Sequence, residues 1–575
     1  MQTILFLLRR YLIILIVPVL VGLSACGPAA VQPVTPVPTG TPAPTAIPSP
    51  TPLPRGGDLI IRLATDIPNF QPWRPRNRGE EQLTGLLYNG LMRMNPQLRP
   101  EPDLARKWET TPDGRVITFT LRTDITWHDG EPFDAEDVRF TLDRLRTLPL
   151  TSTALIADLG YIVEVTAPAT NTVVLSLSER YAPLLAGLTV PILPRHRLEA
   201  QDLETVNFWD MTPVGTGPFR FISRVPGQSI VLGRFDSYHY GAPLLDRVAF
   251  VGAADSDLTL SSLQDERLLL AELPWNATRN LTSTIQNIRV GTYPENGFYF
   301  LAFNLREGRA FANPEVRKAL AAALDLPRLV EAATDGQGIP IASSAAPGSW
   351  ADLTPLTDDR LQANLELARA LLTEAGWELP PGSTIRQQNG VPFEAQLLVR
   401  NDDARRIAAA QYLAEVAARI GLQVTVVPTD FETILSKYAP PYDFDLLVGS
   451  WINGAGDPNF ADYAYYDPDD FTLFHSSQIN QGIEDTRITR NFVGFSDPVY
   501  DEQSVLGRQL YTIDERIDAY RQTQTRVFEQ LPYLYLWADR IPVVLNQRVK
   551  TLDGPIDLST PVYLWNIERW YLDTP

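Results

Sequence analysis

The chain has 575 residues, of which 44% are hydrophobic and 20% are charged, so most of it is expected to form a globular body of two or three domains. The formal net charge of −19 argues against a nucleic-acid partner and against binding to anionic lipid through basic patches. A single cysteine excludes a disulfide within the chain, and the four histidines lack metal-site spacing, so we expect no cofactor and no metal.

The first 25 residues have the three parts of a secretory signal: basic residues, a short apolar run and small residues before a cleavage point. The apolar run, 11–23, is shorter than the about 20 residues that a membrane span needs. It ends in Leu-Ser-Ala-Cys, which resembles the bacterial lipobox, with Cys26 as the lipidated first residue of the mature chain. The alternative is an ordinary signal peptide with an incidental cysteine.

Residues 26–57 are expected to form a linker. About a third of the positions in 27–54 are proline, alternating with threonine, valine and alanine. Such a sequence favours extended polyproline II and buries no core. We therefore expect a semi-rigid spacer between a lipid anchor and a folded body that begins near residue 58.

The first half of the body has mixed strand and helix patterns. Apolar residues fall on alternate positions of 115–122, which predicts a half-buried strand. Asp134 is expected to cap a helix, with Asp137 at the third helical position as in a capping box. Further strands are predicted at 58–63, 171–177 and 229–232.

The second half alternates strand and helix patterns, which predicts an α/β sheet. Asn313-Pro314 is typical of a helix start, and Gly376 and Gly421 are expected to end two other helices. The predicted strands are 298–305, 391–400, 422–427, 444–451 and 533–537, and the predicted helices after the first are 361–375, 404–420 and 513–530.

A set of motifs follows in order along the body. They are PDLARKW at 102–108, HDGEPFDAEDV at 128–138, VGTGPF at 214–219, FN at 303–304 with PEVRKALAAA at 314–323, and DP at 457–458. Together they resemble the extracytoplasmic solute-binding proteins of ABC importers, in the oligopeptide, dipeptide and nickel-binding branch known as family 5. The resemblance covers essentially the whole body, from about residue 58 to 565.

The resemblance implies an α/β, two-lobed periplasmic-binding-protein-like fold of type II, with an extra subdomain in lobe I. Lobe I would span 58–297, with the subdomain at about 98–213, and lobe II would span 298–534. The segment 535–575 would return to lobe I. The first and last predicted strands of lobe II would be the crossovers, and the lobes would close over a ligand by hinge motion.

The resemblance also implies a ligand site between the lobes. Trp451 ends a predicted strand and offers a stacking face and one donor, although a core tryptophan is the alternative. In peptide-binding relatives an aspartate three residues after that tryptophan receives the ligand α-amine, and this chain has Gly454 there. Asp457 is the candidate replacement counter-ion, or simply a turn starter.

Other residues complete the predicted site. Arg400 and Arg405 flank a strand-to-helix turn and are candidates to clamp a carboxylate, although a solvated helix start explains them too. The remaining predicted ligand contacts are Asp66, Asn69, Phe70, Trp73, Asn453 and Trp537.

These features predict a substrate-binding lipoprotein that captures a peptide or peptide-like solute and delivers it to the permease subunits of an ABC importer. We expect a monomer, held by its lipid on the outer side of the cell membrane or in the periplasm. The alternatives are a secreted hydrolase such as a glycosidase, or a solute sensor for a membrane signalling partner. No catalytic residue is predicted, since G-x-S-x-G, H-E-x-x-H and glycine-rich phosphate motifs are missing.

Overall fold

The computed structural model describes residues 54–148, 154–252, 256–278, 281–353, 361–452, 466–480 and 490–573. These ranges belong to a compact unit that spans Leu53–Pro575. The predicted signal, Cys26 and most of the predicted linker lie outside the described residues, as do Asn453, Gly454 and Asp457.

One long sheet passes through this unit. Ten strands follow one another in the order β18-β17-β19-β13-β20-β11-β1-β10-β9-β8, and β12 and β14 also pair with β20. The bounds are β1 Asp58–Leu63, β8 Phe219–Val225, β9 Ser229–Arg234, β10 Arg247–Gly252, β11 Leu270–Glu272, β12 Ile288–Pro294, β13 Gly297–Phe303, β14 Gly338–Pro340, β17 Glu394–Arg400, β18 Gln423–Thr429, β19 Leu446–Ile452 and β20 Tyr533–Asn546.

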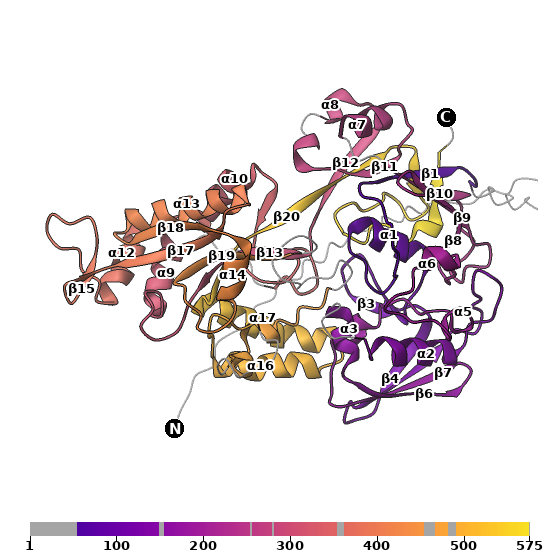
Figure 1. The fold of residues 1–575 in the computed structure, drawn as a ribbon, viewed down its shortest axis with the longest axis horizontal. Helices are drawn as coiled ribbons and strands as arrows, with labels where there is room; N and C mark the ends of the chain where they lie inside the picture. The colour runs from indigo at the N-terminus through magenta and orange to yellow at the C-terminus, as the bar shows by residue number, and fades with distance from the viewer. Residues whose placement is uncertain are drawn as a thin grey trace, which may run out of the picture. The chain divides into compact units, whose positions relative to one another are not determined.

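Strand β20 joins two half-sheets because its two ends pair with different strands. Tyr533–Trp537 pairs with β13, whereas Val543–Leu545 pairs with β11. A second connection runs beside it, where β12 ends at Pro294 and β13 begins at Gly297. Figure 1 shows β20 extending from one group of strands to the other. We call the half with β1 and β8–β12 lobe I, and the half with β13, β14 and β17–β19 lobe II.

The observed β20 is longer than the predicted strand 533–537. Asp539, Arg540 and Pro542 follow, and such residues ordinarily end a strand. In the structure this polar stretch is the part of β20 that passes between the lobes, and the strand continues to Asn546. Pro542 lies opposite Thr292 of β12 without interrupting the pairing.

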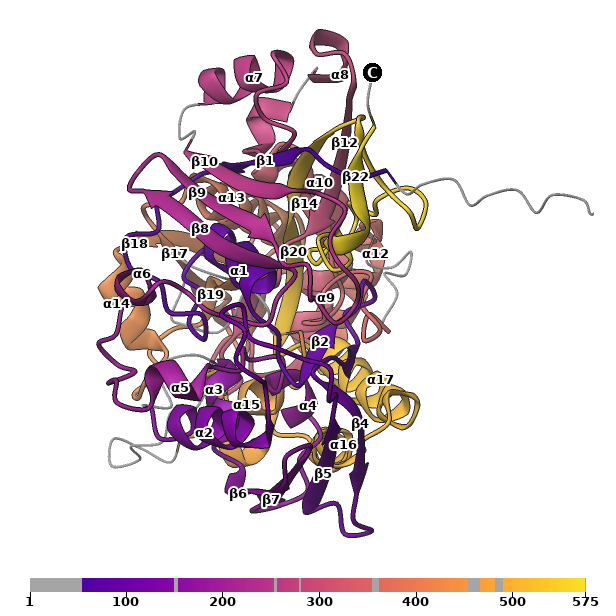
Figure 2. The same cartoon turned by 90° about the vertical axis from the view of Figure 1, so that its right-hand side faces the viewer.

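Lobe I carries a separate four-stranded antiparallel sheet in the order β4-β5-β7-β6. Helix α2 packs against β6 and β7, and Figure 2 shows it beside these strands. The predicted capping box is present: the Asp134 carboxylate accepts from Glu136 N at 2.9 Å, and Asp137 accepts from Asp134 N at 3.2 Å. The bounds are β4 Ala105–Thr110, β5 Val116–Leu121, β6 Ile162–Ala169, β7 Thr172–Leu177 and α2 Ala135–Leu145.

Most of the helices predicted for lobe II are present in the structure. The helices are α9 Pro314–Ala323, α10 Leu326–Thr334, α12 Leu365–Glu374, α13 Ala404–Arg419, α14 Phe431–Lys437, α16 Pro498–Gln509 and α17 Ile513–Gln530. Helix α12 starts later than predicted because Asn364 caps it by accepting from Leu367 N. The predicted strand 391–400 is two strands, β16 (Val391–Pro392) and β17, since Pro392 cannot donate to a continuing ladder.

Short elements complete the described chain. They are α1 Arg78–Leu87, β2 Met92–Met94, β3 Pro100–Pro102, α3 Ala154–Leu159, α4 Leu184–Gly187, α5 Arg195–Leu198, α6 Phe208–Met211, α7 Ser256–Gln264, α8 Leu281–Thr284, β15 Gln387–Gln388, α15 Phe471–Phe474, β21 Val549–Thr551 and β22 Trp570–Leu572. The residues after β20 pack in the lobe I core, where Ile556, Tyr563 and Trp570 are buried.

Candidate functional site

The parallel strands of both lobes end beside the crossovers. In lobe II, β17 is parallel to β18 and β19, and Ile452 at the end of β19 pairs with Gly297 at the start of β13. In lobe I, β1 is parallel to β10 and β11, and Glu272 at the end of β11 pairs with Val543 of β20. Ligands of α/β sheets bind at the carboxyl ends of parallel strands. The region between these two edges is therefore the candidate ligand site.

The predicted contacts of lobe I lie in the loop that follows β1. Asp66 pairs with Arg224 at 3.3 Å, with part of its carboxylate exposed. The ring of Phe70 is fully buried and stacks on Trp209 at 5.1 Å, and Trp73 packs edge-on against Phe208. Phe70 is therefore a core side chain with no exposed surface in this conformation, and its contact with a ligand stays a prediction. Trp73 lines an internal cavity of lobe I, whereas Asp66 keeps an exposed edge.

Asn69 lies in the same loop and has an unusual environment. Its side-chain oxygen is buried, and no donor from the described ranges reaches it. A buried amide oxygen without a donor is unfavourable. Asn69 thus remains a predicted ligand contact, with an acceptor that is still available.

The two predicted tryptophans of lobe II are both buried. Trp451 is 2% exposed, and its ring lies against Phe300 at 5.9 Å and Tyr438 at 5.5 Å. Trp537 has no exposed surface and stacks on Tyr299, with ring centroids 4.3 Å apart. In this conformation both are core side chains, as in the alternative interpretation of Trp451. Direct contact of either ring with a ligand stays a prediction.

Arg405 lies in the first turn of α13 and is tied to the crossover strand. Its Nη1 donates to both carboxylate oxygens of Asp539, at 2.9 and 3.1 Å, and its Nη2 donates to the Tyr299 hydroxyl at 2.5 Å. Asp539 also accepts from Trp537 Nε1 at 3.1 Å. Burial raises the pKa of Asp539, and the neighbouring guanidinium opposes that rise. Arg405 is thus engaged in fixing β20 where it leaves lobe II.

Arg400 is also engaged within lobe II. Its guanidinium pairs with the Asp402 carboxylate at 2.7 Å and lies over the Phe431 ring at 4.3 Å. These contacts hold it at the carboxyl end of β17 beside the start of α13. Each of the two guanidinium groups already has a carboxylate partner in this conformation, so the contact of Arg400 and Arg405 with a ligand carboxylate stays a prediction.

Sequence reasoning missed a charged cluster at the edge of lobe I. Arg78, the first residue of α1, pairs with Glu81 at 2.7 Å and with Glu295 of the crossover at 3.5 Å. Glu272 lies beside them and accepts from the hydroxyls of Tyr293 and Tyr563, each at 2.9 Å. Burial raises the pKa of both Glu81 and Glu272. Three carboxyl groups therefore surround one guanidinium where the chain passes between the lobes.

Lobe II reaches this cluster through Tyr466, in the segment that follows β19. Tyr466 is buried among Met94, Leu98 and Ala186 of lobe I. Arg78 acts on it as a hydrogen-bonding neighbour and opposes the rise in the pKa of Tyr466 that burial causes. The run of charges in Arg74–Glu81 was the available sequence signal, but it resembles a solvated helix start.

Residues 99–472 match the family of bacterial extracellular solute-binding proteins, family 5, and the chain belongs to this family. The oligopeptide-binding protein AppA of Bacillus subtilis is 25% identical over 534 residues, which cover 90% of this chain and 92% of that protein. The expected two-lobed α/β fold is confirmed, since family 5 binding proteins with this fold are the structural neighbours.

Two solved structures illustrate the range of the fold. The unliganded open form of MppA, a periplasmic murein tripeptide-binding protein, has a TM-score of 0.74 at 20% identity and covers 90% of this chain and 97% of that chain. NikZ from Campylobacter jejuni in complex with Ni(L-His) has a TM-score of 0.64 at 23% identity and covers 89% of this chain and 99% of that chain. At these identities the likeness shows the fold alone.

Two further features concern metals and membranes. Across the ranges that the structure describes, no group of three or more His, Cys, Asp or Glu side chains is arranged to hold a metal ion. None of the helices in those ranges combines the length and apolarity that crossing a bilayer takes.

Proposed function

We propose that this chain is the capturing receptor of an ABC importer, which binds a peptide or peptide-like solute between its lobes and delivers it to the membrane permease. The observation that carries the proposal is the geometry of the two half-sheets. Their parallel strands end beside the same two crossovers, so a ligand between the lobes would contact both edges. A hinge at β20 and at 294–297 would let the ligand stabilise the closed state.

A peptide-like ligand is supported by the relatives and by the charges of the site. The family is one of solute-binding proteins, and the AppA relative is named for oligopeptides. The cluster of Glu81, Glu272 and Glu295 around Arg78 places excess carboxyl groups at the crossover, where they favour cationic ligand groups. Asn453 and Asp457 stay predicted contacts of the same site.

Compaction on ligand binding tests the capture role. Small-angle scattering of the purified full chain should show a smaller radius of gyration when a mixture of short peptides is added, and native mass spectrometry should show an intact bound peptide. Because Gly454 stands where relatives have the amine-binding aspartate, we expect amino-terminally acetylated peptides to bind about as tightly as free ones. Unchanged scattering with every peptide would contradict capture by closure, and cleaved peptides would favour the hydrolase alternative.

We also propose that Cys26 carries the lipid that keeps the receptor near its permease. Two or more acyl chains are needed for stable anchoring, and a mature lipoprotein supplies them. In the native host the chain should fractionate with membranes, and the Cys26→Ser variant should be released without a change in ligand affinity. A variant that stays with the membrane would show that another segment anchors the chain.

A further inference from the structure

One edge of strand β20 changes its partner from lobe II to lobe I between the lobes. On this edge β14 of lobe II pairs with β20, and the Gln337 carbonyl accepts from Arg540 N at 2.9 Å. Two positions further along β20, Leu273 N of lobe I donates to the Pro542 carbonyl at 3.1 Å, and β11 continues the pairing. The opposite edge has no such change there, because β12 pairs with the whole of Arg540–Asn546.

Trp275 bridges the point where the two partners of this edge meet. Both β11 and β14 run antiparallel to β20, so the end of β11 faces the start of β14. The ring nitrogen of Trp275, just after β11, donates to the Asp335 carbonyl at 2.8 Å. Asp335 ends α10 with φ 53° and precedes β14. This hydrogen bond therefore joins the two lobes directly, beside the strand that connects them.

The indole ring also faces the turn that follows Asp335. A Cβ atom built on Gly336 would lie 3.4 Å from Cζ2 of Trp275 and 3.9 Å from Cε2. A methyl group would thus just fill the space between this turn and the ring. The turn can approach the ring only by about that depth before the two collide, because packed groups hardly compress. We call the pairing of Trp275 with Asp335 and Gly336 the hinge contact.

The hinge contact and the contacts of Arg508 lie on opposite sides of the crossovers. Trp275 lies between α7 and α8 in the chain, and Asp335 caps α10. In both views α7, α8 and α10 lie above the middle of β20, whereas α3, α16 and α17 lie below it (Figure 1, Figure 2). On the lower side, Arg508 Nη2 of α16 donates to the Tyr161 hydroxyl of lobe I at 2.6 Å. The crossovers therefore lie between two sets of interlobe contacts.

This arrangement gives the hinge contact a mechanical consequence. When two rigid bodies rotate about a hinge, contacts on one side separate while those on the other side approach. Opening of the lobes at α16 and α3 therefore drives the turn at Gly336 towards the ring of Trp275. The remaining space is small, so the ring meets the turn early in that rotation.

We propose that Trp275 is a positioning residue that limits how far the lobes open in the ligand-free chain. The inference rests on the hinge motion of the proposed function and adds a stop to it. With opening limited, the two edges of the ligand site stay near each other before a ligand arrives. Less ordering is then left for the ligand to bring about, and binding is tighter for the same contacts.

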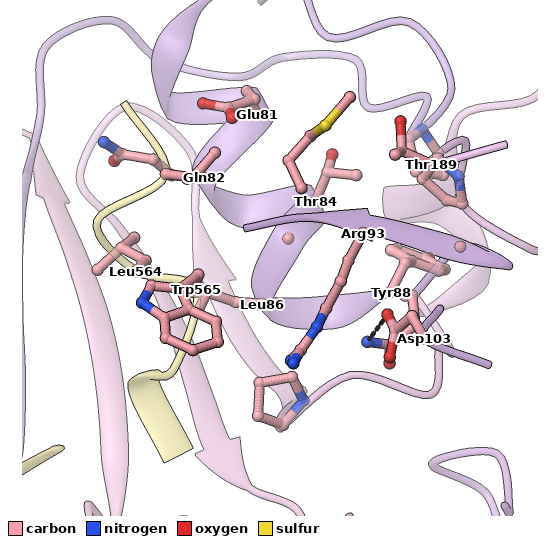
Figure 3. A pocket seen from close by; sticks show the side chains of 18 of the residues that line it. Glu81, Gln82, Thr84, Leu86, Tyr88, Arg93, Asp103, Thr189, Leu564 and Trp565 are labelled. Carbon is pink, nitrogen blue, oxygen red and sulfur yellow. Dashed lines mark hydrogen bonds between the residues drawn. The ribbon is translucent and has the colours of Figure 1, made fainter. Parts of the chain in front are cut away.

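The hinge contact is separate from the ligand side of lobe I. The lobe I cavity lies between α1, β2 and residues 561–568, and its wall includes Trp73 and Glu81 of the candidate site (Figure 3). Neither Trp275 nor Asp335 is among the described residues that line it. A change at Trp275 therefore leaves this wall as it is.

Distances between two spin labels measure the opening without any ligand. Cys26 is the only cysteine of the chain, so Cys26→Ser with Glu164→Cys in lobe I and Asp518→Cys in lobe II provides one label on each lobe. Both labelled positions are exposed. Double electron–electron resonance on the full ligand-free chain then gives the distribution of interlobe distances. We expect Trp275→Ala to shift this distribution to longer distances.

Two further variants separate the ring from the hydrogen bond. Trp275→Phe keeps an aromatic ring but has no donor, so the distribution should stay close to that of the wild type. Leu258→Ala is the matched control, since Leu258 lies on the neighbouring α7 and is 64% exposed, and it should change nothing. Circular dichroism confirms the fold of each variant. Trp275→Leu should give a smaller shift than Trp275→Ala, and it is the readout if the alanine variant is unfolded.

Three results would overturn the proposal: an unchanged distribution in Trp275→Ala, a shift to shorter distances, or equal shifts in Trp275→Phe and Trp275→Ala. The last result would mean that the hydrogen bond ties the lobes together and the ring is no stop. None of these measurements uses a ligand. A wild-type chain that does not compact with peptides would contradict the proposed function, while a longer distance in Trp275→Ala would still show the stop.

Discussion

Glu568 shows how one buried carboxyl group can couple stability to pH. Its side chain lies in the wall of the lobe I cavity, close to Arg93 and Arg569 but largely removed from water. Burial raises its pKa from 4.5 to about 7. Between these values the folded chain holds a proton that the unfolded chain has lost. Stability contributed by this group therefore falls as pH rises from about 4.5 to about 7, and then stays constant.

Glu568→Gln should remove this dependence. A shift from 4.5 to about 7 corresponds to about 3 kcal/mol at most, because one pKa unit is worth about 1.4 kcal/mol. We expect the free energy of unfolding, measured by urea titration, to increase in the variant relative to the wild type as pH rises through this window. The exposed Glu366→Gln is the control and should show no such trend. A difference between Glu568→Gln and wild type that is the same at all pH values would contradict the shift.

The partner of Arg405 could not be predicted from the sequence. Its position after a strand predicted a free guanidinium for a ligand carboxylate, but the structure gives it Asp539 as a partner. That partner lies 134 positions away in the chain, and no local sequence pattern indicates it. The same limit applies to Arg78, whose partners include Glu295. Charged residues at a helix start look alike in sequence, whether their partner is water, ligand or a distant strand.

At the scale of elements, the predictions that succeeded depended on local signals. The capping box at Asp134, the cap at Asn313 before Pro314 and the alternation in β5 are each set by a few neighbouring residues. Helix α17 has the predicted bounds, Ile513–Gln530. These signals act through backbone hydrogen bonds and side-chain spacing within a turn or two, so they are readable before any tertiary contact is known.

The elements that the sequence described poorly depend on distant partners. Strand β20 continues past Asp539 and Pro542 because β11 and β12 pair with its second half. The lobe I cavity likewise combines α1 with residues 561–568, which are separated by most of the chain. The family resemblance predicted a two-lobed fold, but neither the charged cluster at the crossover nor the cavity follows from a motif. Their residues are brought together only by the return of the chain after β20.

At the scale of the whole molecule, lobe II touches the small four-stranded sheet of lobe I through Arg508 of α16. The Arg508 Nη2 donates to the Tyr161 hydroxyl of lobe I at 2.6 Å, whereas its Nε lies 3.2 Å from the Asp469 carboxylate within lobe II. The Arg508 carbonyl accepts from Ala182 N at 2.6 Å. Tyr511 adds a hydrogen bond from its hydroxyl to the Gly114 carbonyl, at 2.8 Å. The contacts with Tyr161, Ala182 and Gly114 hold the two parts together in this conformation.

Contacts that exist in only one of two states bias the equilibrium between them, and we expect the Arg508 contacts to lobe I to be lost when the lobes open. Arg508→Ala should therefore increase the radius of gyration of the unliganded chain in small-angle scattering. Affinity for the ligand identified by mass spectrometry should fall by about tenfold, since about 1.4 kcal/mol of closure energy is lost. Arg521→Ala, on α17 and paired only with nearby Asp518 in the described contacts, is the matched control and should change neither quantity.

The variant leaves Asp469 buried without its guanidinium, and this alone could lower stability. Combining Arg508→Ala with Asp469→Asn removes the buried charge. The hydrogen bond to Tyr161 is still absent in this double variant. If the double variant is as stable as the wild type but still opens and binds more weakly, the effect belongs to the lobe equilibrium. If scattering and affinity return to wild-type values in the double variant, the Arg508 contacts do not hold the closed state, and the hinge at β20 sets the equilibrium alone.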